Sequence, residues 1–335
     1  MSLRIGIVGV GIMGSDHARI FANDVPGVEI ASICDADVAR AKAVADAVGA
    51  RDVAESPEAL IADKAVDAVL LASPDATHAP LTLACLAARK PVLCEKPLAP
   101  GSTDCLEVVA AEAKLGSRLV QIGFMRRYDP AYVAMKAAAK SGTIGRPLML
   151  HCVHRNVSAP PWFTSNMAIA NSAPHEFDIA RFVLDSDMAE ITVFQPEAAD
   201  PQARVKPVFM VLRASSGQLV DVEMNNNAGY GYDVKGELVG STGTMAMRSP
   251  AHVETNRSLT GSIPFPEDWR SRFAEAYRLQ NQAWARAIAS GTFAREGASA
   301  WDGYAASRIA ESGLAALASG ERVKIEMGVR PELYA

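Results

Sequence analysis

The sequence predicts an α/β fold: an N-terminal Rossmann domain with a doubly wound parallel sheet, then an α/β domain with a large open, mainly antiparallel sheet. Three observations lead to this prediction. A short apolar run ends in the glycine-rich turn Gly9-Val10-Gly11-Ile12-Met13-Gly14. Apolar strand-like stretches then alternate with helix-like stretches to about residue 123. Beyond that point, short stretches alternate polar and apolar residues and are separated by Ser/Gly turns.

Length and composition exclude several classes of protein. The chain has 335 residues, enough for two domains, and its 49% hydrophobic and 21% charged residues are ordinary for a globular protein. A net charge of −5 gives no general basic surface, so we expect no nucleic-acid partner. No apolar run is long enough to span a membrane, so we expect no membrane partner and a cytoplasmic location. The five cysteines form no C-x-x-C pair, so no metal site is expected.

The glycine-rich turn predicts a dinucleotide-binding site. Gly9 allows a tight turn out of the first strand, Gly11 lets the backbone approach a pyrophosphate, and Gly14 lets the following helix pack closely. Ile12 and Met13 lie between them and belong to the predicted cofactor site. By themselves, three glycines at this spacing are also compatible with a turn that binds no ligand.

The end of the second predicted strand favours NAD over NADP. Strand 28–34 runs into Asp35, about 20 residues after the last glycine, where such folds place a carboxylate on the adenosine ribose. A carboxylate repels a 2′-phosphate, and Ala36 and Asp37 supply no cation for one. The alternative is that Asp35 caps the helix predicted over 38–48.

The remaining elements of the first domain follow in alternation. We expect strands at 4–8, 28–34, 51–53, 68–72, 91–94 and 119–122, and helices to about 23 and over 38–48, 57–62, 78–88 and 103–115. The predicted domain boundary therefore lies near residue 123, giving an NAD-binding domain at 1–123. A substrate-binding and oligomerisation domain follows at 124–335, with its last helix allowed to pack back on the first.

The second domain is predicted as a meander of strands with few helices. We expect helices over 131–141, 172–184, 269–289 and 299–318, an extended run at 147–156, and strands at 208–214, 218–224, 233–239 and 244–247. These helices can cover one face of a large sheet but not both. We therefore expect the second face to pair with another subunit.

Glu95-Lys96-Pro97 is the first candidate catalytic segment. It lies at the carboxyl end of a parallel strand, where ligands of such sheets bind, and Lys96 there can hold a substrate oxygen and transfer a proton. The alternative is a solvated lysine before a helix. Ser73, in the turn after strand 68–72, His78 and Glu95 are predicted to lie at the cofactor, although His78 could also serve as a capping or surface residue.

Asn171-Ser172-Ala173-Pro174-His175-Glu176-Phe177-Asp178 is the second candidate. On a helix, Asn171, His175 and Asp178 fall on one face, since residues three and four apart are neighbours. Asn171 could instead be the N-cap, which would place His175 at the positive end of the helix dipole. A neutral imidazole suits a base that takes a hydroxyl proton, while a structural histidine remains the alternative.

Further polar residues recur at strand spacing. His154 and Asn156 share one face of the run over 148–156 and suit hydrogen bonds to a hydroxylated ligand, whereas His151 and Arg155 share the other face. Tyr232 follows a Gly-rich turn. The segment 125–129 follows the last parallel strand, so at least one of its arginines is expected at the ligand-binding crevice.

Taken in order, these segments resemble the Gfo/Idh/MocA oxidoreductase family. The glycine-rich turn, Asp35, Glu95-Lys96-Pro97 and His175-Glu176-Phe177-Asp178 match its successive signatures. Within the family the chain looks most like the inositol 2-dehydrogenase branch, through Gly123-Phe124-Met125-Arg126-Arg127-Tyr128-Asp129, His154-Arg155-Asn156 and Gly231-Tyr232-Asp233.

The resemblance implies NAD-dependent oxidation of a secondary hydroxyl of a cyclic polyol to a ketone, with myo-inositol as the first candidate, and a homotetramer assembled through the open sheet. It implies that Lys96 and His175 are catalytic. It also implies a set of residues that line the polyol site: Arg126, His154, Asn156, Asp178, Tyr232 and, by a looser match, Tyr277.

One position departs from the family pattern. Inositol dehydrogenases usually carry aspartate four residues before the catalytic histidine, and here that position is Asn171. An amide can hydrogen-bond a lysine or a hydroxyl, but it cannot balance charge or relay a proton. The alternatives are therefore a dehydrogenase of another inositol isomer, an aldose or an amino-polyol, or a non-catalytic NAD- and sugar-binding regulator.

Overall fold

A computed structural model describes residues 2–197, 203–248 and 253–335. The chain divides into two compact units. The first holds residues 1–128, 275–307 and 327–335, and the second holds 129–274 and 308–326. This division differs from the predicted split into 1–123 and 124–335, because two C-terminal segments return to the first unit.

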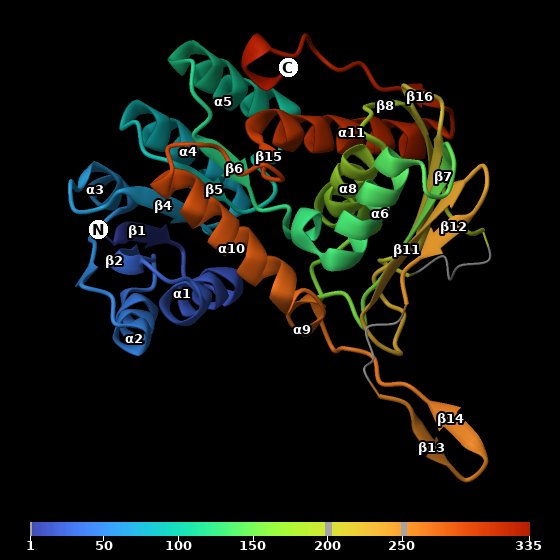
Figure 1. The fold of residues 1–335 in the computed structure, drawn as a ribbon, viewed down its shortest axis with the longest axis horizontal. Helices are drawn as coiled ribbons and strands as arrows, with labels where there is room; N and C mark the ends of the chain where they lie inside the picture. The colour runs from blue at the N-terminus through green and yellow to red at the C-terminus, as the bar shows by residue number, and fades with distance from the viewer. Residues whose placement is uncertain (1, 198–202, 249–252) are drawn as a thin grey trace. The chain divides into compact units, whose positions relative to one another are not determined.

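The first unit contains a seven-stranded sheet of order β15-β6-β5-β4-β1-β2-β3 (Figure 1). Its strands are β1 (Leu3–Val8), β2 (Val28–Cys34), β3 (Asp52–Val53), β4 (Ala68–Leu71), β5 (Val92–Cys94), β6 (Val120–Ile122) and β15 (Ala298–Ser299). The first six are parallel and have the Rossmann order, with β15 antiparallel at the edge. Every residue of β4 is buried, as its continuous apolar run predicts.

Helices follow these strands as expected. They are α1 (Ile12–Asp24), α2 (Val38–Val48), α3 (Pro57–Ala62), α4 (His78–Ala87), α5 (Ser102–Leu115) and α10 (Ala274–Ala289), with short 3₁₀ turns η1 (Asp75–Thr77), η2 (Met125–Tyr128) and η4 (Glu332–Tyr334). Ser56 caps α3 by accepting a hydrogen bond from the backbone N–H of Ala59, and Pro57 occupies the first turn. Helix α11 (Ala300–Ser319) runs from the first unit into the second.

The second unit contains another seven-stranded sheet, of order β12-β11-β7-β10-β9-β8-β16. Its strands are β7 (Pro147–Arg155), β8 (Met188–Phe194), β9 (Val208–Ala214), β10 (Leu219–Asn225), β11 (Asp233–Gly240), β12 (Thr244–Ala246) and β16 (Val323–Lys324). The sheet is mostly antiparallel, but β7 and β10 are parallel neighbours. A pure meander was therefore wrong, because β8 and β9 intervene in the chain between β7 and β10.

One face of this sheet is packed. Alternate residues of β7, β9 and β10 are buried, among them Leu150, Met210 and Val222. Helices α6 (Pro130–Ser141) and α8 (Pro174–Leu184) contact each other, and α8 contacts β7. A short helix, α7 (Ser165–Met167), and a π-helical turn, η3 (Ala168–Ser172), lead into α8.

Two features of the second unit were not predicted. The expected helix over 269–289 is broken, since α9 (Trp269–Arg272) ends at Phe273 before α10 begins. A two-stranded hairpin, β13 (Thr255–Arg257) and β14 (Thr260–Ser262), lies away from the sheet of its own unit (Figure 1). Its turn residues Ser258 and Leu259 both have positive φ.

Candidate active site

The glycine-rich turn has the form that a bound pyrophosphate needs. Gly9 has φ +84°, and a Cβ there would lie 2.6 Å from the backbone of Ala72. A Cβ on Gly14 would lie 1.9 Å from the carbonyl oxygen of Gly9. A Cβ on Gly11, by contrast, would meet no described atom within 4 Å. The first and third glycines thus bring strand and helix together, while the middle one faces open space at the N-terminus of α1.

Asp35 is held at the end of β2 by this turn. Its carboxylate accepts hydrogen bonds from the backbone N–H of Val10 at 2.7 Å and from that of Asp37 at 2.8 Å. Arg40 donates a third at 2.7 Å. Burial alone would raise the pKa of Asp35, but these hydrogen bonds outweigh it and lower the pKa. The capping alternative for Asp35 was wrong, because Asp37 caps α2 through the backbone N–H of Arg40.

Glu95 is locked into the first unit beside Lys96. Its Oε1 accepts a hydrogen bond from Nε2 of His17 at 3.0 Å, and Asn281 of α10 lies 2.9 Å from the other ring nitrogen. The imidazole is fully buried, and Tyr277 packs edge-on against it at 5.6 Å. A Cβ at position 123 would lie 2.6 Å from Oε1 of Glu95, so a larger residue there would displace this carboxylate. Glu95 therefore anchors the Lys96 segment.

His78 holds the other end of the same segment. Its Nδ1 lies 2.7 Å from the carbonyl oxygen of Pro97 and its Nε2 lies 2.8 Å from that of Ser73. Carbonyl oxygens only accept, so both ring nitrogens donate and the buried imidazole is protonated. Burial alone would lower the pKa of His78, but the neighbouring Cys94 side chain and the Pro97 carbonyl raise it to about 10. Both ring nitrogens of His78 therefore bond to backbone carbonyl oxygens within the first unit.

The remaining candidates of the first unit lie at the carboxyl edge of its parallel sheet. Ser73 follows β4 and its hydroxyl is 2.6 Å from that of Thr77. Arg126 lies in η2, after β6, and is buried. Its neighbour Arg127 pairs with Asp302 at 3.0 Å. The structure thus brings the glycine turn, Asp35, Ser73, Lys96 and Arg126 to the sheet edge where dinucleotide folds bind their ligands.

The polyol candidates of the second unit form a row on the packed face of its sheet. His154 is buried and lies opposite Val234 of β11 and Met224 of β10. Asn156 follows two residues later on the same face, and buried Tyr232 lies with its ring 5.7 Å from that of His154. His151 faces the other way, as expected, and contacts Asp221 across the strands.

Helix α8 presents the catalytic candidate to this unit. His175 is the second residue of α8, after Pro174, so it lies at the positive end of the helix dipole. Asp178, three residues later, is almost fully buried. Both interpretations of Asn171 were wrong: it lies in the π-helical turn η3 and not in α8, and the N-cap residue of α8 is Ala173. Such turns occur frequently at functional sites.

Two partners of the predicted residues were missed in the sequence. Glu176 is buried on α8, and its carboxylate lies 3.0 Å from Nδ1 of His154. This contact fixes the orientation of the His154 ring. Arg40 was missed as the partner of Asp35. The signal for Glu176 was its place inside the His175–Asp178 segment. The signal for Arg40 was its place in the first turn of α2, five residues after Asp35.

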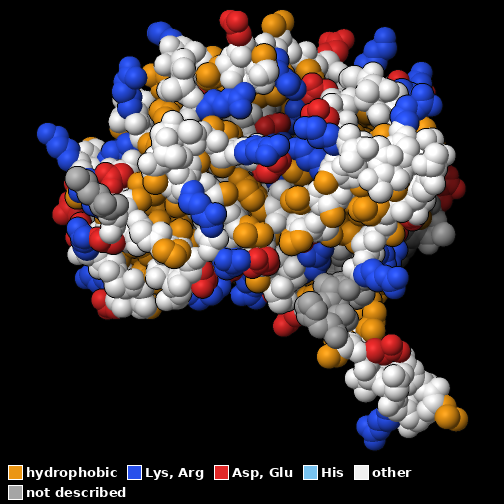
Figure 2. All heavy atoms as spheres, viewed as in Figure 1, with side chains coloured by type: hydrophobic (Ala, Val, Ile, Leu, Met, Phe, Trp, Pro, Cys, Tyr) orange, Lys and Arg blue, Asp and Glu red, His pale blue; other side chains and the backbone are white. Residues whose placement is uncertain are grey.

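On the face shown in Figure 2, Lys and Arg side chains stand among acidic and uncharged ones. Within the described ranges, no helix combines the length and hydropathy needed to cross a membrane. Among those same residues, no group of three His, Cys, Asp or Glu side chains is placed to hold a metal ion.

Comparison with known proteins places this geometry in a family. Residues 3–124 match the oxidoreductase family with an NAD-binding Rossmann fold, and residues 132–246 match the GFO/IDH/MocA C-terminal domain. The chain is 46% identical to inositol 2-dehydrogenase 1 of Saccharopolyspora erythraea, over 100% of this chain and 99% of that protein. It is 43% identical to inositol 2-dehydrogenase of Streptomyces avermitilis, over 99% of this chain and 97% of that protein.

A solved structure agrees over the whole length. The crystal structure of myo-inositol dehydrogenase from Lactobacillus casei, in complex with NAD(H) and myo-inositol, matches with a TM-score of 0.93 and 28% identity, covering 100% of both chains. The predicted fold class is confirmed by this match and by the strand order of the first unit. The chain therefore belongs to the GFO/IDH/MocA family of NAD-binding oxidoreductases.

Proposed function

We propose that this protein oxidises a secondary hydroxyl of a cyclic polyol to a ketone with NAD, and that myo-inositol, oxidised at position 2, is its substrate. The observation that carries the proposal is a row of polar side chains on an otherwise apolar sheet face: His154 and Tyr232, which are buried, and Asn156, which is partly exposed. Buried polar groups of this kind are positioned for a ligand rich in hydroxyl groups. The full-length similarity to inositol 2-dehydrogenases supports the same substrate class.

The roles of the two catalytic candidates follow from their chemistry. His175, at the N-terminus of α8, is the base that takes the hydroxyl proton, because the helix dipole disfavours a positive charge on its ring. Lys96 hydrogen-bonds the oxygen and supports the charge that develops on it. When bound, the nicotinamide supplies the hydride acceptor. Asp178 and Arg126, both buried, hold further hydroxyls of the ring.

The first unit fits NAD, and Asp35 favours it over NADP. The open space beside Gly11 accommodates a pyrophosphate that a side chain would block. The side chain of Asp35 remains anionic and accepts ribose hydroxyls, while its charge repels a 2′-phosphate. Arg40 already forms an ion pair with this carboxylate, so its positive charge is largely neutralised by Asp35 and attracts a 2′-phosphate less strongly.

Asn171 affects the transfer of the proton from the substrate hydroxyl. An amide in place of the usual aspartate cannot carry a proton, so His175 bears more of the proton transfer in this chain.

Initial rates of NAD and NADP reduction across inositol isomers, aldoses and amino-polyols test the substrate assignment. We expect myo-inositol with NAD to give the highest kcat/KM. Tight NAD binding without turnover of any compound would instead support the regulatory alternative.

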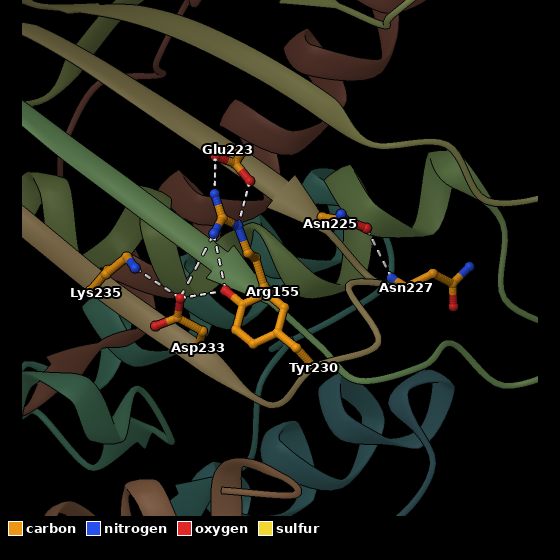
Figure 3. A network of polar contacts seen from close by, with 7 residues as sticks. All are labelled: Arg155, Glu223, Asn225, Asn227, Tyr230, Asp233 and Lys235. Carbon is orange, nitrogen blue, oxygen red and sulfur yellow. Dashed lines mark hydrogen bonds and ion pairs between the residues drawn. The ribbon is translucent and has the colours of Figure 1, made fainter. Parts of the chain in front are cut away.

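We also infer that the outward face of the second sheet pairs with another copy of the chain in a homotetramer. This face carries half-exposed apolar side chains, Phe194 and Phe209, opposite each other on β8 and β9. Beside them lies the ion-pair network of Figure 3, in which Arg155 donates two hydrogen bonds to Glu223, at 2.6 and 2.8 Å. A surface that mixes apolar and charged side chains in this way suits association with an identical surface.

A further inference from the structure

Three consecutive asparagines, Asn225 to Asn227, lie at the C-terminal end of β10, next to the end of β7 that carries His154. The middle one differs from its neighbours. The Oδ1 atom of Asn225 accepts a hydrogen bond from the backbone N–H of Asn227 at 3.0 Å (Figure 3). The Oδ1 atom of Asn227 accepts one from the backbone N–H of Ala159 at 2.7 Å. These two side chains shape the loop. Asn226, between them, is 3% exposed, and its side chain takes part in neither of these hydrogen bonds.

The sheet register places Asn226 on the same face as the polyol candidates. In the parallel pair β7–β10, Met224 lies opposite His154 and Asn225 opposite Arg155. The backbone N–H of Asn156 donates to the carbonyl oxygen of Asn225 at 2.9 Å, which continues the ladder one step further. Side chains alternate along a strand, so Asn226, like His154 and Asn156, points to the packed face.

Only one end of the Asn226 amide has a partner. Its Nδ2 donates to the hydroxyl of Ser172 at 3.3 Å, and Ser172 is the last residue of the π-helical turn that precedes His175. Its Oδ1 is buried and has no hydrogen-bond partner among the described residues. Turning the amide over would leave the NH₂ group in that position instead. Either way, a buried polar atom is unpaired beside the candidate substrate residues, and such atoms are costly unless something bonds to them.

We propose that Asn226 binds a ring hydroxyl of the cyclic polyol and, with Ser172, sets which stereoisomer the site accepts. This inference rests on the proposed function, since the polyol is its ligand. A hydroxyl both donates and accepts, so it pairs with either orientation of the amide. A site built to hydrogen-bond a particular hydroxyl discriminates strongly against analogues that lack it, because the buried amide is then left unpaired.

The test compares Asn226→Leu and Asn226→Ala with Asn225→Ala as the matched control. Leucine keeps the volume of the side chain and removes its polar atoms, and alanine tests whether any effect depends on that volume. Binding of myo-inositol to the protein loaded with NADH, which cannot accept a hydride, is measured by calorimetry, and turnover with NAD is measured in parallel. Monodeoxy-inositols lacking one hydroxyl each are compared with myo-inositol in every variant.

We expect both Asn226 variants to raise Kd and KM for myo-inositol by at least about 10-fold, with Kd for NAD unchanged and Asn225→Ala like the wild type. One of the monodeoxy-inositols should bind the wild type more weakly than myo-inositol does. In the Asn226 variants the same compound should bind no more weakly than myo-inositol. Wild-type polyol binding in both variants would overturn the inference and show that only water fills the position. Because binding is read without turnover, a wild type that binds the polyol but fails to oxidise it would overturn the proposed reaction alone. A wild type that does not bind inositols would overturn both.

Discussion

The Nε2 atom of His17 lies 3.0 Å from Oε1 of Glu95, and this buried contact joins helix α1, which follows the glycine-rich turn, to the segment that carries Lys96. The neighbouring Pro97 is held by His78 in turn. Two buried histidines therefore position one short segment, so a substitution of either histidine should displace Lys96.

His17→Ala should destabilise the first unit and displace Lys96. Removing the imidazole leaves a buried carboxylate without its donor, which costs about 1–3 kcal/mol of unfolding free energy. We expect a lower kcat with little change in KM for the polyol. Chemical denaturation and steady-state kinetics measure both. Arg51→Ala, which breaks the exposed ion pair with Glu29, is the control and should cost less than about 1 kcal/mol. Equal costs for the two variants would argue against a special role for His17.

His78→Gln should reveal the protonated imidazole through its pH dependence. The pKa of His78 is about 10 in the folded protein, above its ordinary value of 6.5. Its contribution to stability is therefore fully present below about pH 6.5 and is lost as the pH rises through about 10. The difference in unfolding free energy between wild type and variant should shrink across that window. A difference that stays constant with pH would mean that the ring is neutral.

Asp35→Ala should change cofactor preference. The carboxylate is the only ribose acceptor that we assign, and a hydrogen bond to a charged group contributes roughly 1.5–3 kcal/mol, so kcat/KM for NAD should fall about 10-fold or more. The ratio of NADP to NAD activity should rise, because Arg40 is released from its ion pair. Asp37→Ala, which removes the cap of α2 and a 3.9 Å ion pair with Arg40 but leaves Asp35 in place, is the matched control. A cofactor ratio unchanged in Asp35→Ala would contradict this assignment.

Phe209→Asp should weaken assembly. A charge at this position faces the apolar outward surface beside Phe194, and burying it in an interface without a partner is unfavourable. Sedimentation velocity should show a smaller species for the variant than for the wild type, which we propose to be a tetramer. Val329→Asp, at an exposed position of the first unit, should leave the assembly intact. A wild type that sediments as a monomer would refute the predicted assembly outright.

Much of the fold was predictable because its signals are local. Helices over 38–48 and 57–62 and the strand over 208–214 were predicted with the bounds that the structure shows, since caps, prolines and alternation mark them. The parallel pairing of β7 with β10 was not predictable, because register between distant strands leaves no local mark. The turn η3 was missed for a similar reason, since a π-helical turn has no sequence period of its own.

The candidate site divides in the same way. Residues in recognisable motifs, such as Gly11, Lys96 and His175, were found from the sequence. Partners that act from a distance were missed or misjudged: His17 reaches Glu95 from another element, and Asn226 differs from its two asparagine neighbours only by facing the packed side. Strand alternation would have found Asn226 if the end of β10 had been predicted one or two residues later.

The most direct test of the central claim is the rate of NADH formation from myo-inositol by the wild type, His175→Ala and Lys96→Ala, with NAD binding measured in each. We expect the wild type to turn over and each variant to lose at least about 10²-fold in kcat while still binding NAD, the magnitude of general acid–base catalysis. A variant with the wild-type kcat would remove that residue from the mechanism, and a wild type that oxidises no polyol would contradict the account.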